Sequence, residues 1–168
     1  RSVAVVTGAN RGIGNAIAVG LAEAGANIVA VHRSEVSATR LAIEALGRRF
    51  VSVEVDLQDR GSVASIIDVA LGTFGKIDIL VNAAGIIRRQ SSMEFSDKNW
   101  DEVLLVNLKV PFDLSRAVAR SMVTRGIPGR IIHLASLLSF QGGINTASYT
   151  ASKSAIRGLT KILANEWA

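Results

Sequence analysis

The sequence predicts an α/β fold: a three-layer, doubly wound parallel sheet with helices on both faces. Five short apolar segments are predicted as strands, and the first, at 3–7, lacks an alternation of apolar and polar residues, which is typical of a strand buried on both faces. Longer segments with apolar residues at helical spacing separate them, and this alternation indicates parallel strands joined by right-handed crossovers. The pattern favours the strand order 3-2-1-4-5, with a ligand beside strand one. The expected strands are 3–7, 27–32, 50–55, 77–81 and 129–135.

Five helices are expected between and after these strands. Gly75 is the expected stop of the third, because glycine readily adopts the left-handed conformation in which many helices end. Pro111 lies inside the fourth and removes one internal hydrogen bond, so we expect a kink near Asn107, with a freed carbonyl that can hold a water. A loop is expected at 137–146. The helices are expected to reach about residue 24 from the first strand's turn and to cover 36–46, 59–74, 97–125 and 147–167.

Composition favours a single globular domain over residues 1–168. Hydrophobic residues make up 49% of the chain and charged residues 20%, which is enough apolar material for one core. The absence of cysteine excludes disulfides, thiolate metal sites and cysteine nucleophiles. His32 and His133 lack metal-ligand spacing, so no metal site is expected. The chain begins on a strand without Met and ends in a helix without a stop signal, so we expect a partial chain cut at both ends.

The net charge of +5 argues for small anionic ligands rather than for nucleic acid. The basic residues are scattered and aromatics are only 5% of the chain, whereas nucleic-acid binding needs a clustered patch. No apolar run reaches the ~18 residues of a membrane span. No signal peptide precedes the first strand. We therefore expect no membrane association and a cytoplasmic location.

A glycine-rich turn follows the first strand and opens the first helix. Glycines permit a tight turn and a close approach of the backbone to a ligand, and the helix N-terminus offers N–H groups to a phosphate. The spacing Gly-x-x-x-Gly-x-Gly is a variant of the dinucleotide fingerprint of Rossmann-type folds. A turn without a ligand is the alternative. The expected cofactor contacts here are Gly8, Asn10, Arg11, Gly12, Ile13 and Gly14.

The end of the second strand bears on the choice of cofactor. In dinucleotide folds an acid there selects NAD, whereas a nearby Arg accommodates the extra phosphate of NADP. Here His32 occupies the strand end, and Arg33 and Arg11 lie near the expected ribose, which favours NADP. Glu35 could instead swing in, and Arg33 could be an ordinary solvated residue. The cofactor is therefore predicted as NAD or NADP.

Two further strand ends offer cofactor contacts. Asp56, followed by Leu57, could accept a hydrogen bond from an adenine amino group, or could cap the helix expected near Asp59. After the fourth strand, small residues let the backbone lie close to a flat ligand. The expected contacts there are Asn82, Ala83, Ala84 and Gly85.

Arg88 and Arg89 follow the fourth strand, on the edge where ligands bind in such sheets. Arginine is suited to holding a carboxylate with two parallel hydrogen bonds, so either residue is a candidate for an acidic substrate. A solvated loop pair is an equal alternative.

Tyr149 and Lys153 are one helical turn apart and share a face of the last helix. A free tyrosine hydroxyl titrates near ~10, and a neighbouring ammonium favours its ionised form, so the pair can exchange a proton with a substrate oxygen. Ser136, at the end of the fifth strand, can hold the same oxygen. A solvated Tyr–Lys pair is the alternative when the spacing is taken alone.

Taken together, these motifs resemble the short-chain dehydrogenase/reductase family over the whole chain. The shared positions include Thr7 and Gly8 with Gly12 and Gly14, Asp56, the 82–85 segment, Asn107, Ser136, Tyr149 and Lys153; Ala83 departs from the family's usual second Asn. The resemblance implies hydride transfer between a nicotinamide and a carbonyl or secondary alcohol. It assigns Tyr149 as acid/base, Lys153 to the tyrosine and the nicotinamide ribose, Ser136 to the carbonyl, and Asn107 to a relay water. It also implies a homotetramer or homodimer formed through the long helices.

Within that family, the segments 45–50, 87–89, 139–143 and 148–154 are similar to those of bacterial sugar-acid dehydrogenases. This likeness implies a small-molecule substrate such as 2-deoxy-D-gluconate, bound by Arg88, Arg89, Ser136, Gln141 and Tyr149, and it favours NAD. Another ketone, such as a 3-oxoacyl thioester, is the alternative substrate. A cofactor-binding sensor without turnover is the alternative outside enzymes.

Overall fold

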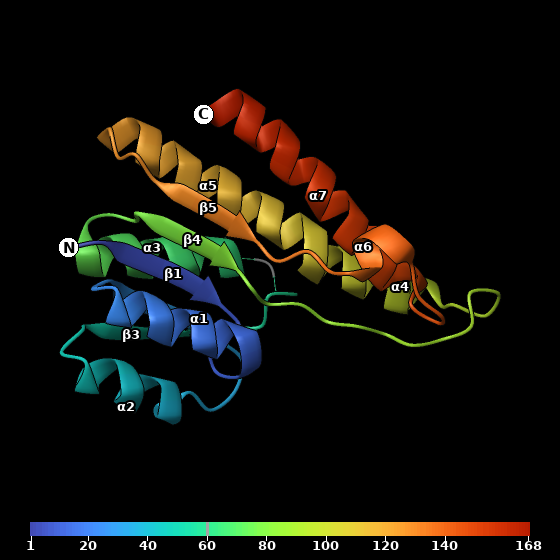
Figure 1. Cartoon of the computed structure of the whole chain (residues 1–168), viewed down its shortest axis with the longest axis horizontal. Coiled ribbons are helices and arrows are strands. Elements are labelled where there is room, and N and C mark those ends of the chain that lie inside the picture. The colour runs from blue at the N-terminus through green and yellow to red at the C-terminus, as the bar shows by residue number, and fades with distance from the viewer. Residues whose placement is uncertain (60) are drawn as a thin grey trace. The chain divides into compact units, whose positions relative to one another are not determined.

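The computed structural model describes residues 1–59 and 61–168. Five strands form one sheet in the order β3-β2-β1-β4-β5, as predicted (Figure 1). The central strand β1 pairs in parallel with β2 and β4, and β2 pairs in parallel with β3. Both β1 and β2 are buried along their whole length, as the lack of alternation predicts for β1. The strands are β1 (Val3–Thr7), β2 (Asn27–His32), β3 (Phe50–Glu54), β4 (Ile79–Asn82) and β5 (Arg130–His133).

The helices follow the strands in the expected alternation, which with right-handed crossovers makes a doubly wound α/β fold. Gly75 ends the third helix in the left-handed conformation, as predicted. The first helices are α1 (Gly12–Glu23), α2 (Ser37–Ala45) and α3 (Ser62–Phe74), and the later ones are α4 (Asp97–Leu104), η1 (Leu105–Lys109), α5 (Val110–Arg125), α6 (Leu138–Gln141) and α7 (Ala147–Trp167).

Two details differ from the sequence-based expectation. The segment 137–146 is not wholly a loop, because one short turn of helix, α6, forms inside it. Within the long helix, the disturbance expected near Asn107 takes the form of a π-helical segment, η1, between α4 and α5. Pro111 lies two residues after that segment, and because it has no N–H it cannot donate the α-helical hydrogen bond to the Asn107 carbonyl.

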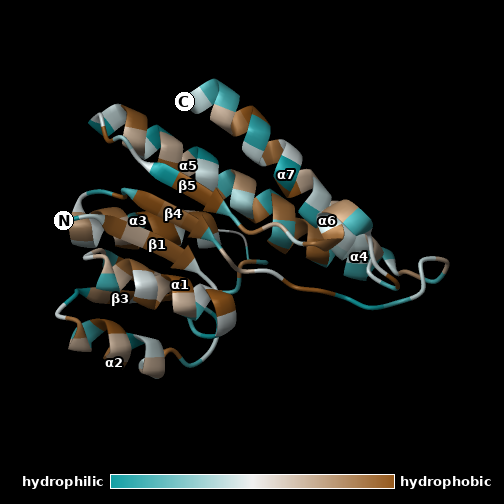
Figure 2. Cartoon of the chain, viewed as in Figure 1, coloured by the Kyte–Doolittle hydropathy of each residue, from teal (hydrophilic) through white to brown (hydrophobic). Residues whose placement is uncertain are grey.

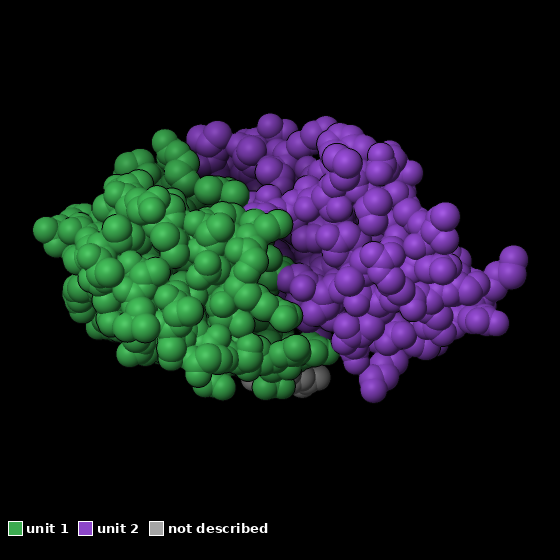
Figure 3. Space-filling model, turned by 60° about the horizontal axis from the view of Figure 1, so that its bottom comes forward, with its two compact units in different colours: residues 1–84, 114–132 green, residues 85–113, 133–168 purple. Residues whose placement is uncertain are grey.

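The described residues fall into two compact units, shown in different colours in Figure 3. Unit 1 comprises Arg1–Ala84 and Leu114–Ile132, and unit 2 comprises Gly85–Asp113 and His133–Ala168. In unit 1 the buried apolar side chains come mainly from β1, β2 and β4, and Figure 2 shows β1 and β4 as largely hydrophobic. That residues 1–168 form one domain stays a prediction.

Unit 2 is helical, with α7 packed against α4, η1 and α6. Val103, Val106, Ile156 and Leu163 are buried in it, and Trp100 meets Phe95 edge to face at 6.4 Å between ring centroids. None of the helices among the described residues has the length and apolar character needed to cross a membrane.

Candidate active site

The glycine-rich turn of unit 1 requires glycine for steric reasons. Gly8 and Gly12 have φ angles of +68° and +55°, a region that side chains with a Cβ rarely adopt. A Cβ at Gly14 would lie 2.2 Å from the Gly8 carbonyl oxygen, and one at Gly8 would lie 3.1 Å from the Ala84 Cα. At Gly12, by contrast, nothing lies within 4 Å of an added Cβ. The turn is therefore tightly packed at Gly8 and Gly14 and open at Gly12.

The N-terminus of α1 is available to an anion. Within the described residues, its N-cap Arg11 makes no capping hydrogen bond and its first turn carries no acidic side chain. A helix N-terminus of this kind presents N–H donors and a positive dipole end. Arg11 and Ile13 are exposed, and Asn10 donates from Nδ2 to Ser34 Oγ at 2.9 Å, which ties the turn to the loop after β2. These features fit a phosphate-bearing dinucleotide.

The end of β2 has no acidic side chain free to select NAD. His32 is buried, and its Nδ1 lies 2.7 Å from the Ser34 carbonyl oxygen. Glu35 turns to the start of α2, where its Oε1 accepts hydrogen bonds from the N–H groups of Val36 at 2.8 Å and Ser37 at 2.6 Å. The hydrogen bonds from Ser37 hold the pKa of Glu35 below its ordinary value. Glu35 therefore caps a helix instead of swinging toward the ribose position.

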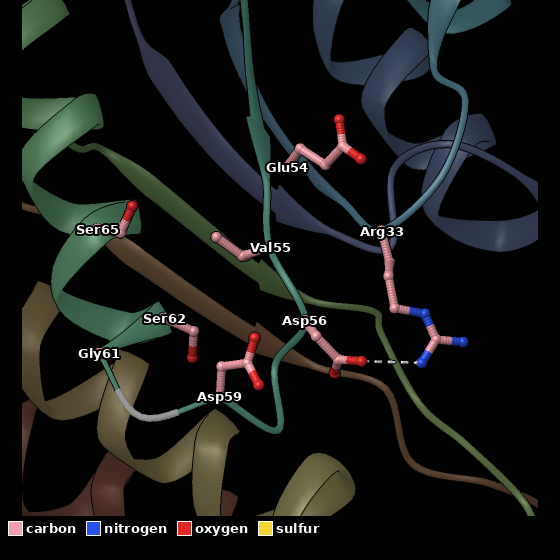
Figure 4. A pocket seen from close by; sticks show the side chains of 8 residues that line it. All are labelled: Arg33, Glu54, Val55, Asp56, Asp59, Gly61, Ser62 and Ser65. Carbon is pink, nitrogen blue, oxygen red and sulfur yellow. Dashed lines mark hydrogen bonds and ion pairs between the residues drawn. The ribbon is translucent and has the colours of Figure 1, made fainter.

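Arg33 pairs with Asp56 at 3.2 Å, across the loops that follow β2 and β3 (Figure 4). Asp56 also accepts from Gln58 N–H at 2.9 Å, and this bond, followed by that of Arg33, lowers the pKa of the carboxyl. Asp56 does not cap α3: that alternative is wrong, because Gly61 is the N-cap and no side chain caps the helix. Leu57 is half-buried beside Asp56.

The Arg33–Asp56 pair borders a pocket of about 540 Å³ in unit 1. Figure 4 shows polar side chains around it from the loop after β3 and from the start of α3. Such a pocket can accept the adenosine end of a dinucleotide. Arg33 contacts Asp56 through Nη1 alone and its side chain is 64% exposed, so its remaining N–H donors are open to a phosphate, whereas Asp56 can accept from an amino group. The lining residues are Arg33, Glu54, Val55, Asp56, Asp59, Gly61, Ser62 and Ser65.

Thr7, at the end of β1, holds the segment after β4. Its Oγ1 accepts hydrogen bonds from the N–H groups of Ala83 and Ala84, both at 3.0 Å. Asn82 is buried and donates from Nδ2 to Ser115 Oγ at 3.3 Å. Small side chains at 83 and 84 allow the close approach of Gly8 described above. Thr7 was singled out in the sequence only through the family resemblance, because a Thr at a strand end carries no distinctive signal.

Unit 2 brings together Lys153, Tyr149 and Asn107. Lys153 is 5% exposed, and its Nζ donates to the Leu134 carbonyl oxygen at 2.6 Å. Burial lowers the pKa of Lys153. The Nζ atom lies 5.9 Å from the centroid of the half-buried Tyr149 ring, one helical turn away on α7. This lysine is therefore not the solvated partner of an ordinary surface pair.

Ser136 lies just before α6 in a tight hydrogen-bonded turn. Its Oγ accepts from Leu138 N–H at 3.2 Å, and its own N–H donates to Ser139 Oγ at 3.2 Å. Because the Oγ acts as an acceptor in this turn, its hydroxyl proton can be donated to a ligand. Gln141, at the end of α6, is exposed.

Asn107 connects the loop after β4 to α7. Its Oδ1 accepts from Ile86 N–H at 2.8 Å, and its Nδ2 donates to the Ile86 carbonyl at 2.9 Å and to Ser152 Oγ at 3.2 Å. Ser152 in turn donates to the Tyr149 carbonyl at 2.8 Å. The side chain of Asn107 is 1% exposed and fully engaged with protein groups. Sequence reasoning missed Ser152, although its place one residue before Lys153 was a signal.

Arg88 and Arg89 differ although they are adjacent. Arg88 forms an ion pair with Glu102 of α4, with 2.9 Å between Nη2 and Oε2. Arg89 is exposed. Sequence reasoning treated the two as equivalent and missed Glu102, whose distance along the chain hides the pairing. In the described residues, no cluster of His, Asp or Glu is suited to a metal ion.

Comparison with known proteins gives a consistent assignment. The 2-dehydro-3-deoxy-D-gluconate 5-dehydrogenases of Dickeya dadantii and Escherichia coli are 52% and 49% identical over 166 residues, which is 99% of this chain and 66% of each relative. The chain thus spans about two thirds of their length. A solved structure from Agrobacterium tumefaciens is 45% identical and has a TM-score of 0.85. It is named as a candidate 2-deoxy-D-gluconate 3-dehydrogenase with bound NADP, and the match covers 99% of this chain and 65% of that chain. The model of the short chain dehydrogenase family matches residues 2–168, so the chain belongs to that family.

Proposed function

We propose that this chain is the cofactor-binding and catalytic part of an NADP-linked oxidoreductase that interconverts a ketone and a secondary alcohol on a sugar acid. The observation that carries the proposal is the buried Lys153, fixed by Leu134 at 2.6 Å one turn from Tyr149. A lysine is rarely buried unless its charge has a use, and perturbed ionisable groups concentrate at functional sites. Sugar-acid relatives about 50% identical to this chain support the substrate class.

The proposed cofactor contacts lie in unit 1. The N-terminus of α1 and the turn Gly8–Gly14 would hold the phosphates, Asp56 the adenine amino group, and Arg33 the extra phosphate of NADP. Glu35 is hydrogen-bonded at the start of α2, so its carboxylate is not free to bind the ribose and favour NAD. Solved relatives named as containing NADP support this choice. When bound, the nicotinamide group supplies or accepts the hydride.

The proposed proton chemistry lies in unit 2. Tyr149 would donate its hydroxyl proton to the substrate oxygen during ketone reduction and take it back during alcohol oxidation. Lys153 places its Nζ 5.9 Å from the centre of the Tyr149 ring and would also hold the nicotinamide ribose. Ser136 would donate a hydrogen bond to the same oxygen. Asn107 would fix Tyr149 through Ser152, and because its amide is occupied, a relay water would bind a carbonyl of η1 instead.

The test is the change in nicotinamide absorbance during turnover. The purified protein is given 2-dehydro-3-deoxygluconate or a neutral ketone, each with NADH and with NADPH, and Tyr149→Phe is the control. Oxidation of NADPH driven selectively by the sugar acid, and abolished in Tyr149→Phe, is the expected result. Activity confined to the neutral ketone would overturn the substrate class, and full activity of Tyr149→Phe would overturn the mechanism.

A 3-oxoacyl thioester is the second candidate substrate. The 3-oxoacyl-[acyl-carrier-protein] reductase of Escherichia coli is 38% identical over 164 residues. Two adjacent arginines in the loop after β4 favour a carboxylate over a thioester. Equal turnover of a 3-oxoacyl thioester would reverse this preference. Turnover of neither substrate, with intact cofactor binding, would favour a sensor.

We also propose that the protein works in the cytoplasm of its cell as a homotetramer or homodimer. In unit 2 an apolar hollow of about 540 Å³ lies along α4, η1, α5 and α7, and such surfaces commonly pack against another subunit. Leu108→Glu should therefore lower the mass measured by light scattering, whereas Leu41→Glu, at an exposed site on α2, should not. The lining residues are Leu104, Leu105, Leu108, Lys109, Phe112 and Leu159.

A further inference from the structure

The loop after β4 carries two adjacent arginines in opposite environments. Arg88 pairs with Glu102 at 2.9 Å, and its Nη1 also donates to the Ile87 carbonyl at 3.3 Å. Arg89 is exposed and makes no hydrogen bond or ion pair among the described residues. Of the two cations, Arg88 is already committed within unit 2, whereas Arg89 is available.

Anchoring alternates along this loop. Ile86 is held by Asn107 through both its N–H and its carbonyl, Arg88 by Glu102, and Gln90 by bonds to Ser96 and Asn99. The three anchored residues are half-buried, whereas the two between them are exposed. Arg89 is thus an exposed residue between two anchored ones, and it shares none of the contacts that hold Arg88.

Both ends of the loop adjoin the catalytic side chains of unit 2. At one end, a Cβ at Gly85 would lie 3.6 Å from Lys153 Nζ. At the other end, Gln90 N–H donates to the Asn145 carbonyl at 3.1 Å, four residues before Tyr149. The loop therefore begins close to Lys153 and is tied, at the residue after Arg89, to the segment that leads into α7 and Tyr149.

Charge separates the two arginines further. A carboxylate approaching Arg88 also meets the negative charge of Glu102, so the pair offers it little net attraction. Arg89 retains its full charge and its planar fork of donors, which suits bidentate binding of a carboxylate.

We propose that Arg89 binds the carboxylate of the substrate, and that Arg88 is a positioning residue that fixes the loop through Glu102. The inference rests on the proposed function, because it takes the substrate to be a sugar acid. It assigns acid selectivity to one side chain and loop geometry to the other, so the two can be separated by substitution.

The test compares a sugar acid with its carboxamide, which has the same skeleton without the charge. For Arg89→Ala, the ratio of kcat/KM for the acid to that for the amide should fall about 10- to 100-fold, mainly through the KM of the acid. Arg89→Lys should recover part of the ratio, since it keeps the charge but not the fork. Arg88→Ala and Glu102→Gln should keep the ratio, lower Tm, and change the kinetics of acid and amide in parallel.

If the ratio of kcat/KM for the acid to that for the amide falls in Arg88→Ala and is unchanged in Arg89→Ala, the inference is overturned while the proposed function stays in place. Calorimetry with D-gluconate and NADP separates the other failures. Binding of gluconate that is lost in Arg89→Ala, without any turnover, would support Arg89 and overturn the proposed reaction. If neither D-gluconate nor 2-dehydro-3-deoxygluconate binds or reacts, both proposals are overturned.

Discussion

Replacement of Gly14 by alanine should distort the glycine-rich turn that follows β1. The same replacement at another glycine of the helix serves as the control, because it adds a methyl group where there is no clash. At Gly14 the added Cβ would lie 2.2 Å from the Gly8 carbonyl oxygen, 2.8 Å from its carbon and 3.2 Å from the Thr7 carbonyl oxygen. All three are backbone atoms, so no side chain can rotate away. To reach even 3.0 Å from the oxygen, the turn must move by about 0.8 Å.

Gly20 provides the matched control on α1. It is exposed, and nothing lies within 4 Å of a Cβ built there. Both substitutions gain the helix preference of alanine over glycine, about 1 kcal/mol. Gly20→Ala should therefore raise the free energy of unfolding by about that amount. The free energy of unfolding of Gly14→Ala should be lower than that of Gly20→Ala by the cost of the clash, about 1–3 kcal/mol by analogy with overpacked cores.

Urea denaturation measures both free energies, and calorimetry with NADPH measures the effect on cofactor binding. Gly14→Ala should bind NADPH more weakly than Gly20→Ala, because displacement of the turn misaligns the N–H groups at the start of α1. Equal stability and equal affinity of the two variants would refute the reasoning. In that case the close approach of α1 to Gly8 would not be a constraint on the site.

Three further predictions concern unit 2. Asn107→Ala removes three hydrogen bonds, one buried and two part-buried, and should lower the free energy of unfolding by about 2–4 kcal/mol. Asn99→Ala loses the single side-chain bond from Nδ2 to Gln90 and should lower it by about 1 kcal/mol; denaturant titration would contradict this if the two costs were equal. Ser148 is fully buried and its Oγ lacks a partner among the described residues, so Ser148→Ala should raise Tm, and a lower Tm would count against that reading. Burial, followed by the charge of Lys153, lowers the pKa of His133 from its ordinary value of 6.5, so on acidification the unfolded chain takes up the proton before the folded one. The stability that is present above pH 6.5 should therefore be lost as the pH falls through the lower pKa of the folded state. His133→Gln should flatten that part of the profile of unfolding free energy against pH.

The sheet could be predicted because its signals are local. Each buried strand is a short apolar run, and each strand end is marked by a change to glycine or polar residues. The strand order followed from alternation with helices, and the structure has the same order. The π segment and α6 could not be predicted, because a single turn has too few residues to establish a period.

The cofactor side of the candidate site was also accessible from the sequence, because it depends on backbone geometry. The lack of space at Gly14 excludes any residue with a Cβ, and the positive φ angles at Gly8 and Gly12 strongly favour glycine. What the sequence left open was the use of charged side chains. Glu35 could have faced the ribose position, and only its bonds to Val36 and Ser37 indicate that it caps α2 instead.

The catalytic side depends on partners far apart in the chain, which explains why its residues were recognised by motif rather than derived. Lys153 is held by Leu134, and Arg88 by Glu102. Neither contact could be predicted from the sequence, because Leu134 contributes a backbone carbonyl and Glu102 is far from Arg88 along the chain. Asn107 is the clearest case: the sequence places it beside the kink expected from Pro111, but only the structure identifies its partners as Ile86 and Ser152. The consequence is physical: substitution of a distant partner that acts through its side chain, such as Glu102 or Ser152, should alter the reaction, since that side chain sets where a motif side chain lies, whereas Leu134 and Ile86 act through backbone atoms that a substitution leaves in place.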